Sequence, residues 1–187
     1  MNERFYLFVT LLVLVILSLI AAWIYYYLRV RRLYGQSWEA ILARLVPIDK
    51  GNLRIVALDL LGEADRLDRR DGPCELESSE IVELIGDLEG LRAIQRNCET
   101  LIALACYCQR LYPEALIVAE ELRLNAREIW WYLDRLDAAA RNGSSRAAFG
   151  EYAQRMATIY YLMTHRLIAL YAIANAPGIE KLQLSLA

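Results

Sequence analysis

The chain contains 187 residues, of which 57% are hydrophobic and 24% are charged, and its 21 basic and 23 acidic residues leave a formal net charge of −2. This length is sufficient for one domain, or for one domain and an anchor. Only 9 glycines and 4 prolines occur, which excludes a collagen-like or intrinsically disordered chain. The near-neutral charge removes the usual electrostatic basis for binding nucleic acid, so we expect no nucleic-acid partner.

The first feature along the chain is an apolar run from Phe5 to Leu28 that contains no charged residue. About 20 apolar residues suffice to cross the hydrocarbon core of a bilayer as a helix, whose backbone satisfies its own hydrogen bonds there. Residues 1–34 are therefore predicted to form a single transmembrane anchor in contact with membrane lipid. Aromatic and basic side chains mark the membrane interface at its C-terminal end: Trp23, Tyr25, Tyr26, Tyr27, Arg29, Arg31 and Arg32.

The charges that flank the run predict its orientation. Three arginines follow it, whereas only Glu3 and Arg4 precede it. By the positive-inside rule, the N-terminus is expected outside and the long C-terminal part in the cytoplasm, as in a single-pass protein of the cell inner membrane. A cleaved secretory signal is the competing interpretation. The run is too long for a signal, the segment before it is barely basic, and arginines follow it directly.

Two short helices and a loop are predicted next. Residues 35–62 form a short helical segment, with one helix that ends before Pro47 and a second from about Gly51 to Leu61. Residues 63–78 are rich in both charges and contain the Gly72-Pro73 pair, which breaks regular structure. This charged segment is predicted to be a solvated linker.

Residues 79–176 are predicted to form three long helices. The first ends near Leu111, the second near Arg141 and the third near Asn175, each before glycine or proline residues that end a helix. Short links between long helices favour antiparallel neighbours. Residues 177–187 form a C-terminal tail, whose stretch from Ile179 to Leu186 alone shows an apolar–polar alternation of useful length.

Apolar residues in the three long helices recur at the a and d positions of heptads, and the adjacent e positions are also apolar. A stripe of this width lets a helix contact two partners. The fold class predicted is all-α: an N-terminal transmembrane helix followed by an antiparallel bundle of three long helices plus two short helices. The inward residues of the second helix are Ala115, Val118, Leu122, Ile129, Tyr132, Leu136 and Ala139, and those of the third are Phe149, Tyr152, Met156, Ile159, Met163, Leu170 and Ile173.

Residues that carry chemistry are few. Cys106 and Cys108 point to nearly opposite sides of a helix, and the four cysteines include no Cys-x-x-Cys pair. The one histidine, His165, has no second histidine to complete a metal site. No catalytic, cofactor-binding or metal-binding residues are predicted, and no cofactor is expected.

Two groups of residues are candidates for contact with another protein. Trp130-Trp131 lies in the middle of a helix where one indole must point outward, and Arg127 and Arg135 lie four residues from Trp131. Exposed tryptophan beside arginine is typical of interface hot spots. Gly86 and Gly90 weaken the first long helix, which predicts that another backbone, from this chain or a second one, approaches there.

The function predicted is that of a membrane-anchored cytoplasmic helical bundle that acts as a non-catalytic protein-interaction or scaffold module. Its partner is another protein, a membrane complex or a second copy of the chain. One alternative is a small accessory subunit of a larger membrane complex for transport, electron transfer or light harvesting. Another is a helical enzyme with an apolar substrate, for which the sequence indicates no catalytic residue.

Overall fold

The structure, a computed structural model, describes residues 3–34, 36–67, 76–141 and 145–186. Within these ranges all regular structure is helical and no strand occurs, which confirms the predicted all-α class. The internal contacts divide the chain into two units, residues 1–37 and 38–187.

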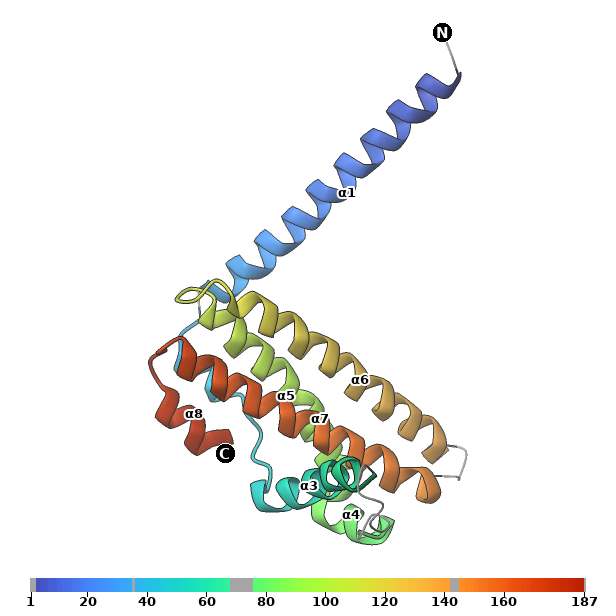
Figure 1. The fold of residues 1–187 in the computed structure, drawn as a ribbon, viewed down its shortest axis with the longest axis vertical. Coiled ribbons are helices and arrows are strands. Elements are labelled where there is room, and N and C mark those ends of the chain that lie inside the picture. The colour runs from blue at the N-terminus through green and yellow to red at the C-terminus, as the bar shows by residue number, and fades with distance from the viewer. Residues whose placement is uncertain (1–2, 35, 68–75, 142–144, 187) are drawn as a thin grey trace. The chain divides into compact units, whose positions relative to one another are not determined.

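The first unit is formed by helix α1 (Glu3–Tyr34), drawn in blue in Figure 1. Its stretch Tyr6–Tyr25 has a mean hydropathy of 2.9 and is long and apolar enough to cross a membrane. Thr10 Oγ1 donates a hydrogen bond to the Tyr6 carbonyl, and Ser18 Oγ donates one to the Val15 carbonyl. These two hydroxyl groups are therefore satisfied by the helix itself, as an apolar environment requires.

The second unit contains three long helices that contact one another in every pair: α5 (Asp87–Cys108), α6 (Ala115–Arg141) and α7 (Ser145–Ile173). They run side by side (Figure 1). Four shorter helices complete the described part of the unit: α2 (Trp38–Leu42), α3 (Lys50–Leu67), α4 (Ser78–Ile85) and α8 (Ile179–Leu186).

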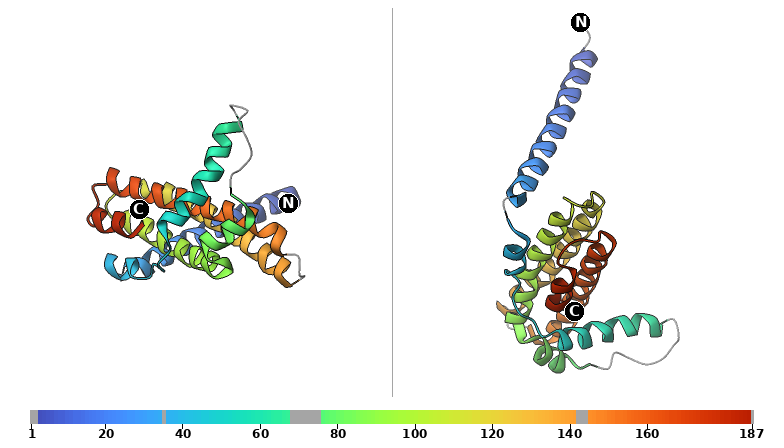
Figure 2. Two further views of the ribbon diagram at one scale, coloured as in Figure 1. Left: turned by 90° about the horizontal axis from the view of Figure 1, so that it is seen from below. Right: turned by 90° about the vertical axis from the view of Figure 1, so that its left-hand side faces the viewer.

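Helix α7 is the central element of this unit. Besides α5 and α6, it contacts α3, α4 and α8, whereas α2 lies on α5. Figure 2 shows that α3 crosses the direction of the long helices rather than following it. The largest fully buried side chains on α7 are Met156, Met163, Leu167 and Tyr171. Because α7 has neighbours on several sides, it buries more than the one stripe that a simple bundle helix would bury.

Most of the inward positions predicted for α6 and α7 are buried or half-buried, but Ile173 is exposed. Tyr171, which was not assigned inward, is buried in its place. At this end of α7 the neighbours are Trp38 and the carbonyl of Leu104 on α5, and both meet Tyr171. The heptad register therefore holds as far as Leu170 and fails at Ile173.

The first long helix is not continuous, contrary to the prediction. Gly86 ends α4 in a left-handed conformation with φ of +82°, and Asp87 follows with φ of +60°. Helix α5 then begins at Asp87. A residue without Cβ adopts positive φ at little cost, so Gly86 is where the chain changes direction between the two helices.

Two further boundaries differ from expectation. Helix α3 continues to Leu67, into the segment predicted as a charged loop, whose residues 68–75 lie outside the described ones. The C-terminal tail contains helix α8, in which Leu182 and Leu186 are buried. The spacing of these two leucines places them on one side of a helix, so contact with α7 selects helix over the alternating pattern.

The two ends of the second unit meet at Trp38. The Trp38 indole N–H donates to the hydroxyl of Tyr171 at 3.2 Å, and this hydroxyl donates to the Leu104 carbonyl at 2.9 Å. A Cβ at Gly178 would lie 2.7 Å from the Trp38 ring, so only glycine fits beside it. Residues from the beginning, middle and end of the unit are thus linked through Trp38 and Tyr171.

Candidate functional site

The two sides of α6 differ in what they contact. One side carries the residues packed against α5 and α7, including Leu122, Ile129 and Leu136, all of them fully buried. The opposite side exposes large apolar side chains along most of the helix. Exposed apolar residues on a surface are common singly, whereas a row of them along one helix face indicates a contact surface.

Three of these exposed residues are spaced by seven along α6. The exposed fractions of Ile117, Leu124 and Trp131 are 64%, 62% and 48%. A spacing of seven residues corresponds to nearly two turns, so the three side chains lie almost in line. We call this row the outer stripe. The repeat has the period that helices use to pair with another helix.

Within the outer stripe, Trp131 makes the best-defined contacts with neighbouring side chains. The guanidinium carbon of Arg135 lies 4.2 Å from the centroid of the Trp131 ring, a cation–π geometry. The ring of Tyr132 meets the Trp131 ring edge to face at 5.1 Å, and Tyr132 in turn packs on Tyr152 of α7 at 5.4 Å. The exposed indole is therefore held by a chain of aromatic contacts that reaches the core.

Charged residues flank the outer stripe on both sides. Taking 100° per residue, Arg127 and Asp134 lie on one side of Trp131, whereas Glu128 and Arg135 lie on the other. All four are exposed. Glu128 accepts a hydrogen bond from the Tyr132 hydroxyl at 3.2 Å. Each side thus carries one positive and one negative charge near the exposed indole.

The predicted interaction residues lie in two separate places: one group is on α6, and the other, Gly86 and Gly90, is where α4 meets α5. Trp130, Trp131, Arg127 and Arg135 are all exposed on α6. Ile117, Leu124, Glu128 and Asp134 belong to the same surface but were not identified from the sequence. The signal that marks Ile117 and Leu124 is a second apolar heptad, on the side of α6 opposite to the buried one. Glu128 and Asp134 are identified only as the charged residues that flank this heptad.

Gly86 and Gly90 have local explanations. Gly86 needs its positive φ, and a Cβ there would meet nothing within 4 Å. A Cβ at Gly90 would lie 1.8 Å from the carbonyl oxygen of Ile85, which belongs to the preceding helix of the same chain. The backbone predicted to approach Gly90 is therefore its own, so these glycines provide no argument for a second chain.

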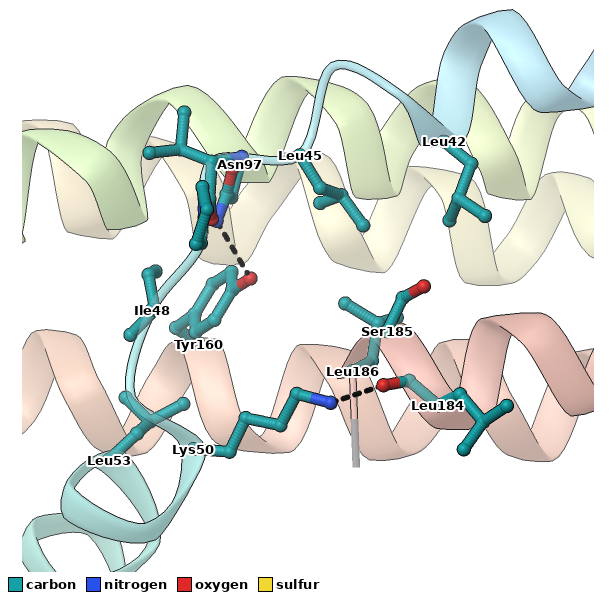
Figure 3. A pocket seen from close by; sticks show the side chains of 12 residues that line it. Leu42, Leu45, Ile48, Lys50, Leu53, Asn97, Tyr160, Leu184, Ser185 and Leu186 are labelled. Atoms are coloured by element: carbon teal, nitrogen blue, oxygen red, sulfur yellow. Dashed lines mark hydrogen bonds between the residues drawn. The ribbon is translucent and has the colours of Figure 1, made fainter.

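A cavity of about 310 Å³ forms a second candidate site, shown in Figure 3. It lies where the segment between α2 and α3 passes between α5, α7 and α8. Its lining is mainly aliphatic and includes Leu42, Leu45, Ile48, Leu53 and Leu184. The described residues of this lining include no carboxylate, thiol or imidazole, the groups that most often serve as general bases.

The polar groups that line the cavity form hydrogen bonds between segments that are distant in sequence. The carboxamide of Asn97 donates to the Val46 carbonyl at 2.8 Å and accepts from the Val46 N–H at 2.7 Å. It also donates to the hydroxyl of Tyr160 at 3.2 Å, as Figure 3 shows. The ammonium group of Lys50 donates to the Leu184 carbonyl. Burial raises the pKa of Tyr160 more than this hydrogen bond lowers it, so its hydroxyl stays neutral.

The remaining candidates for chemistry are the cysteines and the histidine. Cys98, Cys106 and Cys108 are buried thiols, the sulfur of Cys106 accepts a hydrogen bond from Arg123 at 3.0 Å, and Cys74 lies outside the described residues. Burial raises the pKa of Cys98 to about 12. His165 is exposed, with its ring 4.3 Å from that of Tyr161. Among the described residues, no three His, Cys, Asp or Glu side chains converge as metal ligands.

The predicted membrane-interface residues all fall within α1. Trp23 and Tyr25 are exposed. Tyr26, Tyr27, Arg29, Arg31 and Arg32 lie in the helical backbone, and their side chains are outside the described ones. Comparison with known proteins adds no further site: no family model, curated protein or solved structure matches this chain.

Proposed function

We propose that the protein is a membrane-anchored, non-catalytic protein-interaction module. In this proposal α1 crosses the cell inner membrane with its N-terminus outside. The antiparallel bundle of α5, α6 and α7 lies in the cytoplasm, where the outer stripe of α6 binds another protein chain.

Two features of α1 support the anchor. Its apolar stretch Tyr6–Tyr25 is long enough to span the bilayer, and its short hydroxyl side chains are satisfied by its own carbonyls. Arg29, Arg31 and Arg32 follow this stretch. Positive charge next to a span is retained on the cytoplasmic side, which is the basis for the proposed orientation.

The single observation that carries the interaction function is the outer stripe itself. Ile117, Leu124 and Trp131 leave large apolar surfaces in water, although the same helix buries its opposite side completely. Covering such a row with a partner removes apolar area from water, which is favourable. The stacked pair of Trp131 and Arg135 has the composition of an interface hot spot.

The charge of α6 favours a protein over a lipid surface as the partner. Helices that lie on anionic membranes carry mainly lysine and arginine beside their apolar face. Helix α6 instead has five acidic and four basic residues. Its acidic side chains Glu120, Glu128 and Asp134 would face the negatively charged headgroups and oppose such binding.

Site-specific photo-crosslinking in native membranes tests this function. A photoreactive phenylalanine derivative at position 117 or 124 is expected to give discrete protein adducts. The matched control is position 184, where Leu184 is similarly exposed on α8, and no discrete adduct is expected there. Adducts with lipid alone, or equal labelling at all three positions, would contradict a protein-binding role for α6.

Protease treatment of sealed membrane vesicles tests the orientation independently. The bundle is expected to be digested only when the cytoplasmic side is accessible, and the chain is expected to stay in the membrane after alkaline carbonate extraction. Release of the chain by carbonate would remove the anchor from the proposal without affecting the outer stripe.

A further inference from the structure

We infer that the partner of the outer stripe is a second copy of this chain, paired through α6 in antiparallel orientation with Trp131 on the two-fold axis. This inference rests on the proposed function, because it names the partner of the same surface. Its basis is the arrangement of charges on either side of Trp131.

An antiparallel pair brings like sides of the two helices together. In a symmetric pair with the axis at residue 131, residue n lies opposite residue 262 − n, since each residue adds 1.5 Å along the helix. Arg127 then lies within one residue of Asp134 of the second copy, on the same flank. Glu128 likewise lies within one residue of Arg135 of the second copy, on the other flank. Symmetry makes each pair occur twice.

Two of the three stripe residues, Leu124 and Trp131, have apolar counterparts in the same alignment, whereas Ile117 lies opposite residue 145, beyond the end of α6. The indoles of Trp131 from the two copies meet at the axis, and Leu124 lies opposite Ala138 of the second copy. Ala138 is exposed and small, so it leaves room for a leucine. At the outer end of this register, Glu120 lies beside Arg141 of the second copy. Every flanking pair therefore joins opposite charges.

Other alignments of the same stripe lack this agreement. An antiparallel pair centred on Leu124 brings Glu121 beside Glu128 of the second copy. A pair centred midway between Leu124 and Trp131 brings Arg127 and Glu128 each against its own counterpart. A parallel pair in register joins Arg127 to Glu128 of the second copy and Asp134 to its Arg135, but it places Glu120 beside Glu121 of the second copy. Like charges in contact select against these arrangements.

The membrane anchor makes such a small interface sufficient. One helix pair covers less area than the roughly 1,000 Å² that a stable interface in solution needs. Two chains held in one bilayer meet at a raised effective concentration, which compensates for a weak contact. A two-fold axis along the membrane normal also lets both anchors enter the bilayer from the same side.

Disulfide crosslinking of the full-length chain in membranes tests the register, in a Cys74→Ser background. Positions 124 and 138 are each about 21 Å from their own counterpart in the inferred pair, too far for a disulfide. Leu124→Cys and Ala138→Cys alone should therefore give no crosslinked dimer, whereas the double variant should. Dimer formation by either single variant would overturn the antiparallel register.

Charge reversal provides the second test. Arg127→Asp replaces two attractive contacts by two repulsive ones and should reduce crosslinking of the double-cysteine chain about tenfold. Adding Asp134→Arg exchanges the charges and should restore crosslinking. Leu184→Glu, on the exposed side of α8 and distant from α6 in sequence, should leave it unchanged. Failure of the exchange to restore crosslinking would overturn the inferred pairing.

The outcomes separate the inference from the proposed function. Absence of disulfide dimers, together with photo-adducts between position 124 and a different protein, would overturn self-pairing and leave the interaction function standing. Photo-adducts with lipid alone would overturn both. Dimers that form only through positions 124 and 138 together support both.

Discussion

The side chain of Asn97 on α5 forms hydrogen bonds with the segment between α2 and α3. Its carboxamide pairs with both the N–H and the carbonyl of Val46, and it also contacts the hydroxyl of Tyr160. The residue is only 1% exposed. A buried polar group that loses its hydrogen-bond partner stays removed from water with no compensating interaction, which destabilises the fold.

Replacing Asn97 with alanine should therefore lower the free energy of unfolding by about 2–3 kcal/mol, because the Val46 N–H and carbonyl lose their partner. Urea unfolding of the full chain in detergent, followed by circular dichroism, measures this change. Asn125→Ala is the matched control, since Asn125 is half-buried on α6 and its side chain makes no hydrogen bond with other described residues. Equal losses in the two variants would contradict the role given to Asn97.

Whether a residue could be identified from the sequence depends on whether its contacts are local. Trp131 and Arg135 were found because their contact depends only on helical spacing of four residues. Asn97 was not found, since its partners Val46 and Tyr160 are distant in sequence. Hydrogen bonds between separate elements have no periodicity that a single helix would reveal.

At the scale of elements, the helices themselves follow from local sequence, whereas their interruptions do not. Gly86 and Gly90 have the spacing of a close helix crossing, and a continuous helix through both satisfies the heptad pattern. The chain instead turns at Gly86, where φ is +82°. Packing of α4 on α7 and α3 requires this turn, and no local propensity specifies it.

Helix α8 shows the same limitation in a shorter segment. Leu182, Leu184 and Leu186 alternate as in a strand, whereas Leu182 and Leu186 alone are spaced as in a helix. Both periods fit eight residues, so the pattern is ambiguous. Contact with α7 resolves it in favour of helix.

Two alanine substitutions on α8 should therefore have very different effects. Leu182 is 0% exposed and Leu184 is 79% exposed. Leu182→Ala should destabilise the chain by about 2–4 kcal/mol through loss of buried contacts and a residual cavity. Leu184→Ala should change stability by less than about 0.5 kcal/mol. Chemical unfolding of the two variants side by side measures the difference, and similar losses would contradict the helical assignment.

At the scale of the whole molecule, the second unit buries several groups that are neutral only while protonated. Burial raises the pKa of the thiol of Cys98 to about 12, and it raises the pKa values of Cys108, Tyr160 and Tyr171. In the unfolded chain these groups ionise at their ordinary, lower pKa values. Proton release by the unfolded state alone lowers the free energy of unfolding as pH rises.

Stability should thus change little up to about pH 8.5 and fall at higher pH, since thiols begin to ionise there in the unfolded chain. Each fully buried group contributes up to about 1.4 kcal/mol per pH unit between its two pKa values. Cys98→Ala removes one of them and should give a shallower decline between pH 9 and 10 than the parent chain. Urea unfolding at a series of pH values measures both slopes, and identical slopes would show that Cys98 ionises equally in both states.

The packing around Trp38 has a consequence for biosynthesis. The residues that receive this indole are Tyr171 and Gly178, which the ribosome adds more than a hundred residues after it. The first helix of the second unit therefore stays incompletely packed until these later residues have been made. The unit therefore completes this part of its core only after Gly178 has been added, and chains that stop before residue 171 would leave that tryptophan in water.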